Sequence, residues 1–217
     1  MTVTRSDRNL TTSALPVHAI GACPPRAGRL GCALVRTLEL PIKTDRLVLR
    51  PHREEDAPDL LRFYSRPDVA RYLLVGPWTA EDAAREVAKR IPRTGLETDA
   101  RGLALVLEHD GVVIGDIALW HPDDDTRLAE IGWTLDPDYG GRGFASEAAQ
   151  AVLSAAFDVY GLHRVAAQMD ARNSASARLA ERVGMRREAH LRSNWWCKGE
   201  WTDTLIYARL ADDPPPR

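Results

Sequence analysis

The chain has 217 residues, of which 44% are hydrophobic and 28% charged, a composition that suits one globular domain and excludes collagen-like, coiled-coil and wholly disordered proteins. The formal net charge is −2, but residues 1–37 carry five arginines and one acid, so residues 38–217 hold 24 basic and 30 acidic side chains. This acidic body argues against nucleic acid as a partner and would suit a cationic partner such as an amine.

The sequence predicts neither a membrane nor a metal partner. Its apolar runs fall short of the roughly 20 residues that span a bilayer, and the N-terminus has no apolar signal region, so we expect a cytoplasmic protein. Cys23, Cys32 and Cys197 form no CxxC pair, and the six histidines form no HxxxH or HExxH motif, which predicts no metal and no complete disulfide framework.

The two ends of the chain lack the periodicity of regular structure. We interpret residues 1–37 as a loosely ordered N-terminal extension, with a basic interaction tail as the alternative, and residues 212–217 as a frayed C-terminal tail. Residues 38–211 contain no internal repeat and no second core, which predicts a single mixed α/β domain.

Strand and helix patterns alternate along this domain. Alternating apolar residues and the Asp110-Gly111 turn signal predict strands over 46–50, 103–108, 112–120, 127–135, 164–169, 185–191 and 204–209. Apolar residues at helical spacing predict helices over 54–65, over 79–90, from a glycine-rich turn to Gly161, and over 174–183. Thr79 is a predicted N-cap, and Gly161 and Gly184 are predicted C-terminal stops.

The glycine-rich turn, GGRGFA at 140–145, lies between a predicted strand and an amphipathic helix. Its glycines let the backbone approach a ligand closely, and the free N–H groups of a helix N-terminus attract an anion. Arg142 adds a positive charge, so one interpretation is a phosphate-binding turn; the alternative is a glycine-rich connection and nothing more. No GK[ST] follows, and no GxGxxG follows the first strand, so neither a P-loop nor a dinucleotide-binding motif is predicted.

Four segments in this order resemble the GCN5-related N-acetyltransferase (GNAT) superfamily, in the branch that includes the ribosomal-protein N-terminal acetyltransferases RimJ and RimL. They are TDRLVLRP at 44–51, AEIGWTLDPDYGGRGFASEA at 129–148, ARNSASARLAERVGM at 171–185 and KGEWTDTLIYARL at 198–210. The resemblance implies an α/β (α+β) GNAT-type domain. Its mixed, mostly antiparallel sheet would have about seven strands, would be flanked by about four helices, and would splay open after the fourth strand.

The resemblance also implies acetyl-CoA as co-substrate, in the cleft of the splayed sheet. Its pyrophosphate would lie on Gly140, Gly141, Arg142, Gly143, Phe144 and Ala145, and its pantetheine arm would pair with Trp133, Thr134 and Leu135. Asn173 would hydrogen-bond the pantetheine, a role compatible with capping a helix. The family loop begins with Gln or Arg where this chain has Gly140, which predicts weakened but retained cofactor binding.

Acetyl transfer needs a base for the amine and a proton for the departing thiolate. Related enzymes often carry a glutamate base on the strand before the loop, which makes Glu130 the candidate here; an exposed strand residue is the alternative. Ser176, three residues after the asparagine, is the candidate proton donor, because the tyrosine of many family members is Ala180 in this chain. Asp116 and His121 are the next candidate bases.

Three tryptophans, Trp195, Trp196 and Trp201, would either wall an acceptor pocket or cover the sheet edge. Trp195 replaces a carboxylate of some branch members, which puts more weight on Glu130.

The resemblance therefore predicts an acetyl-CoA-dependent N-acetyltransferase that acts by direct attack of a protein N-terminus or a small-molecule amine. A coenzyme A-binding regulatory module with weak turnover is the alternative, and a homodimer stays open.

Overall fold

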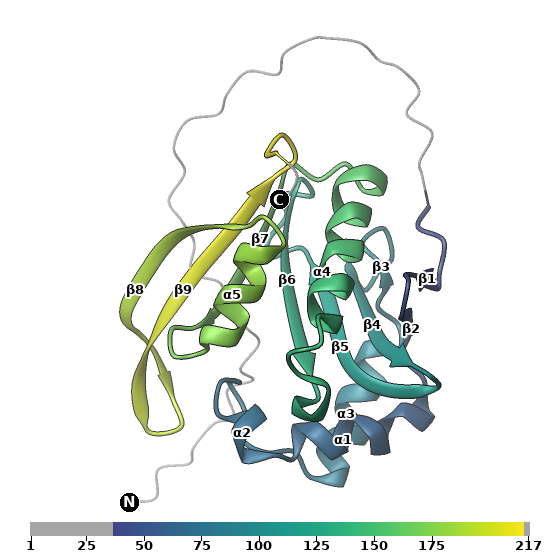
Figure 1. Ribbon diagram of the computed structural model, residues 1–217, viewed down its shortest axis with the longest axis vertical. Coiled ribbons are helices and arrows are strands. Elements are labelled where there is room, and N and C mark those ends of the chain that lie inside the picture. Colours follow the sequence, from purple (N-terminus) through teal and green to yellow (C-terminus); the bar gives the residue numbers. More distant parts are fainter. Residues whose placement is uncertain (1–36, 215–217) are drawn as a thin grey trace, which may run out of the picture. The chain divides into compact units, whose positions relative to one another are not determined.

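The computed structural model describes residues 37–214, so the predictions for residues 1–36, which include Cys23 and Cys32, and for residues 215–217 lie outside the described residues (Figure 1). Within this range one sheet has the strand order β1-β2-β4-β5-β6-β7-β9-β8, with β3 paired to β4 beside this path. Every pair is antiparallel except β6 with β7. No helix of the described range is long and apolar enough to cross a membrane.

The strands are β1 (Ile42–Lys43), β2 (Val48–Pro51), β3 (Thr94–Gly95), β4 (Gly102–His109), β5 (Val112–Trp120), β6 (Leu128–Leu135), β7 (Arg164–Asp170), β8 (Arg186–Cys197) and β9 (Glu200–Leu210). The helices are α1 (Ala57–Tyr64), α2 (Pro67–Ala70), α3 (Ala80–Arg90), α4 (Phe144–Ser154) and α5 (Ser174–Arg182). The predicted fold class is confirmed, and each of the seven predicted strands corresponds to one strand of a sheet that has nine. The additional β1, β3 and α2 have two to four residues each, too few to show a period in the sequence.

Short-range chemistry explains where the helices begin. Thr79 caps α3 as predicted, because its hydroxyl accepts a hydrogen bond from Asp82 N at 3.2 Å while the Asp82 carboxylate accepts from Thr79 N at 2.9 Å. Asn173 caps α5, and Gly143 precedes α4 with a φ of 86°, a conformation natural to glycine. The predicted helix up to Gly161 is α4 followed by a wider π-helical turn over Ala155–Val159.

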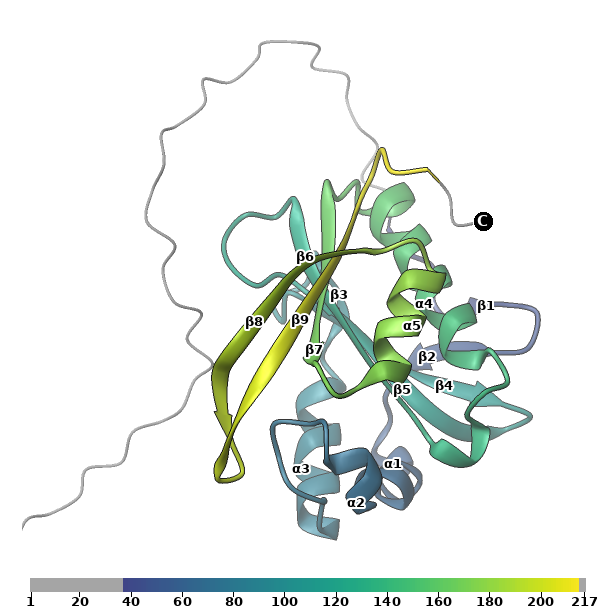
Figure 2. The same cartoon turned by 60° about the vertical axis from the view of Figure 1, so that its left-hand side comes forward.

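Helices cover both faces of the sheet (Figure 2). α4 and α5 pack on one face, where Val152 and Leu153 of α4 are fully buried in the larger core. α1 and α3 pack on the other face, against Val106 of β4 and Val113 of β5. The apolar stripes of the predicted helices thus account for both layers.

The sheet opens between β6 and β7, as the resemblance implied. These parallel strands share only three aligned pairs, from Leu128 opposite Arg164 to Glu130 opposite Ala166. β6 remains paired with β5 up to Leu135, and β7 remains paired with β9 up to Asp170. The edges of β6 and β7 that diverge from each other therefore carry backbone groups available to a strand-like ligand.

A buried arginine joins β2 to the helical layer. Arg50 makes a bidentate contact with Asp56 at 2.8 and 2.9 Å, and its Nε donates to Glu108 at 2.7 Å. Burial alone would raise the pKa of Asp56, but hydrogen bonds from Arg50 and from the N–H of Arg53 outweigh it and hold this pKa below its ordinary value. Removing either carboxyl or guanidinium group would leave its buried partner without this compensation, which is the costly change.

Asp56→Asn should lower the free energy of unfolding by about 2 kcal/mol at pH 7, since a buried arginine loses one of its two charged partners, the one that binds it through two hydrogen bonds. The Asp56 pKa is lower in the folded than in the unfolded state, so its contribution is present above the unfolded pKa of about 3.9 and is lost as pH falls through the folded pKa. Denaturant titrations at pH 7 and pH 3 should show the difference between parent and variant shrinking on acidification. Glu55→Gln, at an exposed neighbouring carboxylate, should shift stability by less than about 0.5 kcal/mol. Equal stability of Asp56→Asn and parent at pH 7 would contradict this account.

Candidate active site

β6 directs its side chains to the two faces of the sheet. Trp133 lies on the face covered by α4 and α5, where its indole Nε1 donates a hydrogen bond to Ser176 Oγ at 3.2 Å. Thr134 lies on the other face, where its hydroxyl is hydrogen-bonded to Tyr64 OH of α1 at 2.9 Å. Glu130 is four positions before Thr134 and faces the same side. Candidate groups therefore occupy both sides of the strand that diverges from β7.

The first turn of α5 holds the predicted Asn173 and Ser176. Because α5 directly follows β7, this turn lies at the divergent end of β7. Asn173 Oδ1 accepts from Ser176 N at 3.1 Å, and among the described residues its Nδ2 has no acceptor. Ser176 Oγ accepts from Trp133, so its own hydrogen remains available to donate. Ala180, at the position of the family tyrosine, is fully buried in the core.

The glycine-rich turn leaves a row of free backbone donors at the start of α4. Gly141 and Gly143 both adopt positive φ, of 72° and 86°. Within residues 37–214 the amide N–H groups from Gly141 to Ser146 donate to no acceptor, and the first helical hydrogen bond runs from Glu147 N to Gly143 O. These free donors and the positive end of the helix dipole favour a negatively charged ligand.

Arginines and aromatic rings surround this turn. The guanidinium of Arg142 lies 5.0 Å from the ring centre of Phe144 and 5.6 Å from that of Tyr139. Arg46, from the turn between β1 and β2, stacks on the same Phe144 ring at 4.6 Å. Two guanidinium groups thus lie beside the free amides, and that of Arg46 is paired with the carboxylate of Glu147 at 2.6 Å.

Glu130 has a neighbour that the sequence interpretation missed. Gln168 Nε2 of β7 donates to Glu130 Oε1 at 2.8 Å. Burial raises the pKa of Glu130 above its ordinary value, and the bond from Gln168 only partly offsets this effect. The sequence contained one signal for this contact. The alternation of strand 164–169 puts Gln168 on the same face as Ala166, and Ala166 is the residue opposite Glu130.

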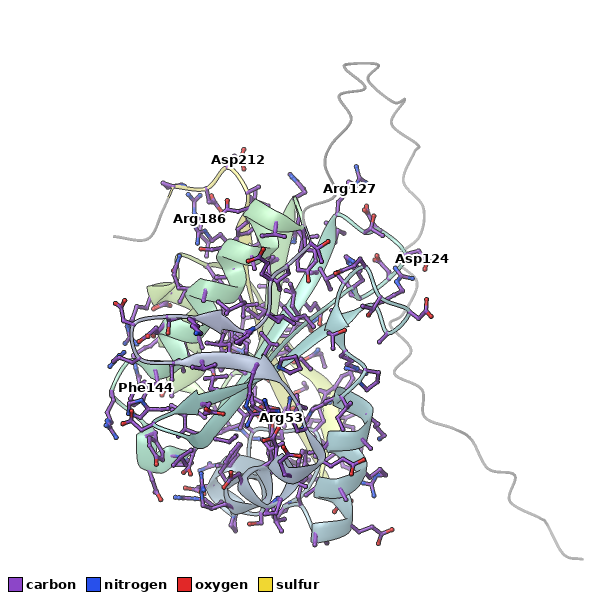
Figure 3. The ribbon with its side chains drawn as sticks, turned by 90° about the vertical axis from the view of Figure 1, so that its right-hand side faces the viewer. Arg53, Asp124, Arg127, Phe144, Arg186 and Asp212 are labelled. Atoms are coloured by element: carbon purple, nitrogen blue, oxygen red, sulfur yellow. The ribbon has the colours of Figure 1, made fainter. Side chains whose placement is uncertain are left out.

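Asp116 and His121, the next candidate bases, each contact a different part of the structure. Asp116 accepts a hydrogen bond from Tyr64 OH at 2.8 Å and lies 3.4 Å from an Arg90 nitrogen. His121 Nδ1 lies 2.7 Å from the carbonyl oxygen of Leu128, at the turn that also contains Asp124. Figure 3 shows Asp124 and Phe144 on opposite sides of the molecule. The described residues contain no group of three or more His, Cys, Asp or Glu that could hold a metal ion.

The tryptophans lie on the β8–β9 hairpin, which extends the predicted strands. A register shift between Leu191 and Trp195 breaks the alternation there, which is why the predicted strand stopped at residue 191. Trp196 and Trp201 pair across the hairpin with ring centres 5.4 Å apart and are both 60% exposed, so they are not core residues. The hairpin tip contacts the segment after α2, where Cys197 Sγ lies 3.5 Å from the Leu74 carbonyl oxygen.

Comparison with known proteins identifies the class. The family model described as Acetyltransferase (GNAT) domain matches residues 46–186, and the chain belongs to this family of acyltransferases. The chain is 31% identical to the uncharacterized N-acetyltransferase p20 of Bacillus licheniformis, over 77% of this chain and 94% of that protein. It is 32% identical to the uncharacterized N-acetyltransferase YnaD of Bacillus subtilis, over 79% and 98%.

Solved structures agree with this assignment. A GNAT-family acetyltransferase from Bacillus anthracis matches with a TM-score of 0.71 and 32% identity, over 79% of this chain and 98% of that one. The RimL ribosomal alpha-N-protein acetyltransferase in complex with coenzyme A shares the fold, with a TM-score of 0.71 and 20% identity over 81% of this chain and 100% of that one. The predicted membership of the superfamily and the enzyme class are confirmed.

Gln168→Leu should raise the pKa of Glu130 further, because the amide N–H that stabilises the ionised carboxylate is removed while burial remains. A carbon-detected NMR titration of the Glu130 carboxyl measures this pKa directly. Gln150→Leu, a substitution of the same kind on α4, should leave the Glu130 pKa unchanged. A Glu130 pKa that stays the same or falls in Gln168→Leu would show that the contact does not exist in solution.

Proposed function

We propose that this chain transfers the acetyl group of acetyl-CoA to a primary amine by direct attack, without an acyl-enzyme. One arrangement supports the proposal: three features lie around the point where β6 and β7 diverge. The free amides of residues 141–146 lie after β6, Ser176 lies after β7 on one face, and Glu130 lies on the other face. A phosphate-bearing thioester and an amine can thus approach the same strand from two sides.

The described residues fit coenzyme A. Its pyrophosphate suits the free amides of the turn, with Arg142 and Arg46 close by. Its pantetheine arm, which carries amide groups, suits the backbone of β6 that has no partner on β7, at Trp133, Thr134 and Leu135. Asn173 Nδ2 is available to the same arm. Solved proteins of this fold, RimL and the microcin C7 self-immunity acetyltransferase MccE, were captured with coenzyme A or acetyl-CoA.

Glu130 and Ser176 divide the proton chemistry between the two faces. Glu130 takes a proton from the attacking amine, through water, and its raised pKa brings it closer to the operating pH. Backbone N–H groups of the divergent part of β6 can donate to the carbonyl oxygen that becomes negative. Ser176 passes its hydroxyl proton to the departing thiolate and regains one from water, while Glu130 releases the proton of the amine to solvent, so the protons balance. Direct attack suits a base and a proton donor that approach from different sides, and Glu130 and Ser176 lie on opposite faces of β6.

The acceptor is a protein N-terminus or a small-molecule amine. Both fit the acidic balance of residues 38–217, and both occur among proteins similar to this chain. One is the spermidine N(1)-acetyltransferase of Escherichia coli, 24% identical over 72% of this chain, and another is the ribosomal-protein enzyme RimL. Gly140 and Ala180 favour a second candidate function, a coenzyme A-binding regulatory module, because both replace residues that related enzymes use.

Gly143→Asp should abolish acetyl-CoA binding in calorimetry. A Cβ at Gly143 would lie 3.3 Å from an Arg46 nitrogen, and the added carboxylate would repel the pyrophosphate. Gly161→Asp is the matched control, because Gly161 has a φ of 63° but open space around it. Both variants bear the same backbone strain, about 1 to 2 kcal/mol, and only Gly143→Asp should lose the ligand. Parent-like affinity in a folded Gly143→Asp protein would remove the turn from the site.

Glu130→Gln should lower turnover by about 100-fold or more at pH 6, where the amine is protonated, since this is the usual range of general-base catalysis. The deficit should shrink as pH approaches the amine's own pKa, about 7.8 for an α-amine and about 10.4 for a lysine-like amine. Ser176→Ala should cost less at neutral pH, because a thiolate leaves tolerably unaided, and its deficit should not shrink in this way.

Thiol release from acetyl-CoA over a panel of amines and peptides provides the measurement for both variants. A Glu130→Gln enzyme with the parent's full pH–rate profile would remove Glu130 from the mechanism. A parent protein that binds acetyl-CoA but releases no thiol with any acceptor would favour the regulatory module.

A further inference from the structure

The turn between β1 and β2 reaches the glycine-rich turn from about 100 positions earlier in the chain. Arg46 donates through its backbone N and its side-chain Nε to the two carboxylate oxygens of Glu147, at 2.9 and 2.7 Å. Thr44 Oγ1 donates to the same carboxylate at 2.6 Å. Glu147 lies in the first turn of α4, where a negative charge also suits the helix dipole. One carboxylate therefore ties the β1–β2 turn to the start of α4.

The same arginine contacts two residues of the turn and lies close to the glycine between them. Its Nη1 donates to the carbonyl oxygen of Arg142 at 2.9 Å, its guanidinium stacks on Phe144 at 4.6 Å, and its Nη2 lies 3.3 Å from the place of a Cβ on Gly143. In a trans peptide the C=O and the following N–H point in opposite directions. By holding the Arg142 carbonyl, Arg46 therefore keeps the N–H of Gly143, which is one of the free amides, pointing away from itself.

We propose that Arg46, held by Glu147 and Thr44, is a positioning residue that forms the pyrophosphate-binding shape of the turn before the ligand arrives. The inference rests on the proposed function, since it takes the turn as the pyrophosphate site. A segment with three glycines among four residues would otherwise have to be ordered at each binding event, and that ordering would reduce affinity. Lysine cannot replace Arg46, because only the planar fork reaches Glu147 and the Arg142 carbonyl together.

Arg46→Ala and Arg46→Lys in the full-length chain should each raise the dissociation constant of coenzyme A by about tenfold or more, the usual effect of a lost charged hydrogen bond. The KM for acetyl-CoA should rise in parallel, while kcat at saturating acetyl-CoA stays within about twofold of the parent, because the acceptor side is untouched. Arg164→Ala is the matched control, since it removes a bidentate contact with Glu188 on β8. It should leave the coenzyme A affinity at the parent's value.

Glu147→Gln separates positioning from direct contact with phosphate. Arg46 remains in this variant but loses its charged anchor, so coenzyme A affinity should fall as in Arg46→Ala. The double variant should bind no more weakly than Arg46→Ala alone, because both changes remove the same constraint. If Arg46→Ala weakens binding while Glu147→Gln does not, Arg46 is a direct phosphate ligand and the positioning role is wrong.

The outcomes also separate this inference from the proposed function. A parent protein that does not bind coenzyme A, or a Gly143→Asp protein that binds it normally, contradicts the proposed site. A parent that binds and an Arg46→Ala protein that binds equally well overturns the positioning role alone. A kcat that falls as far as the affinity in Arg46→Lys, with its melting temperature unchanged, overturns it too, because the defect would then extend beyond the turn.

Discussion

Beyond Glu130, β6 and β7 do not satisfy each other's backbone hydrogen bonds, and the site is organised around that divergence. β5 pairs with the other edge of β6, and β9 pairs with the other edge of β7, so both strands stay hydrogen-bonded in the sheet where they diverge. A parallel pair also sends its following helices to one end of the sheet, which is why the first turns of α4 and α5 both lie where the strands diverge. Donors for an anion and for a strand-like arm therefore gather around the same opening.

The alternation of β6 places the proposed proton donor and the proposed base on opposite faces of the sheet. Trp133 and Ser176 lie on the face of α4 and α5, and Glu130 lies with Gln168 on the opposite face. The Tyr64–Asp116 contact attaches α1 to the Glu130 face, so Asp116 supports the structure around the site instead of standing free. The tip of the β8–β9 hairpin contacts the segment after α2 through Cys197.

The turn at 140–145 combines two properties that oppose each other. Glycine permits the positive φ angles that free the amides, but glycine also gives the turn many other conformations. Contacts from outside the turn limit this freedom. Arg46 and Glu147 supply such contacts from separate segments, each of which also belongs to a motif that resembles the family.

Local pattern by itself determined the seven main strands, the four longer helices, the caps at Thr79 and Asn173, and the glycine-rich turn, because each depends on residues within a few positions of one another. Tertiary structure decided the rest. The partners Gln168 and Glu130 are 38 positions apart, and Arg46 and Glu147 are 101 apart; periodicity tells which face a side chain takes but not what stands opposite. The raised pKa of Glu130 likewise comes from its burial in the folded protein. The length of β8 depends on a register shift in its pairing with β9, which the residues of β8 alone do not predict.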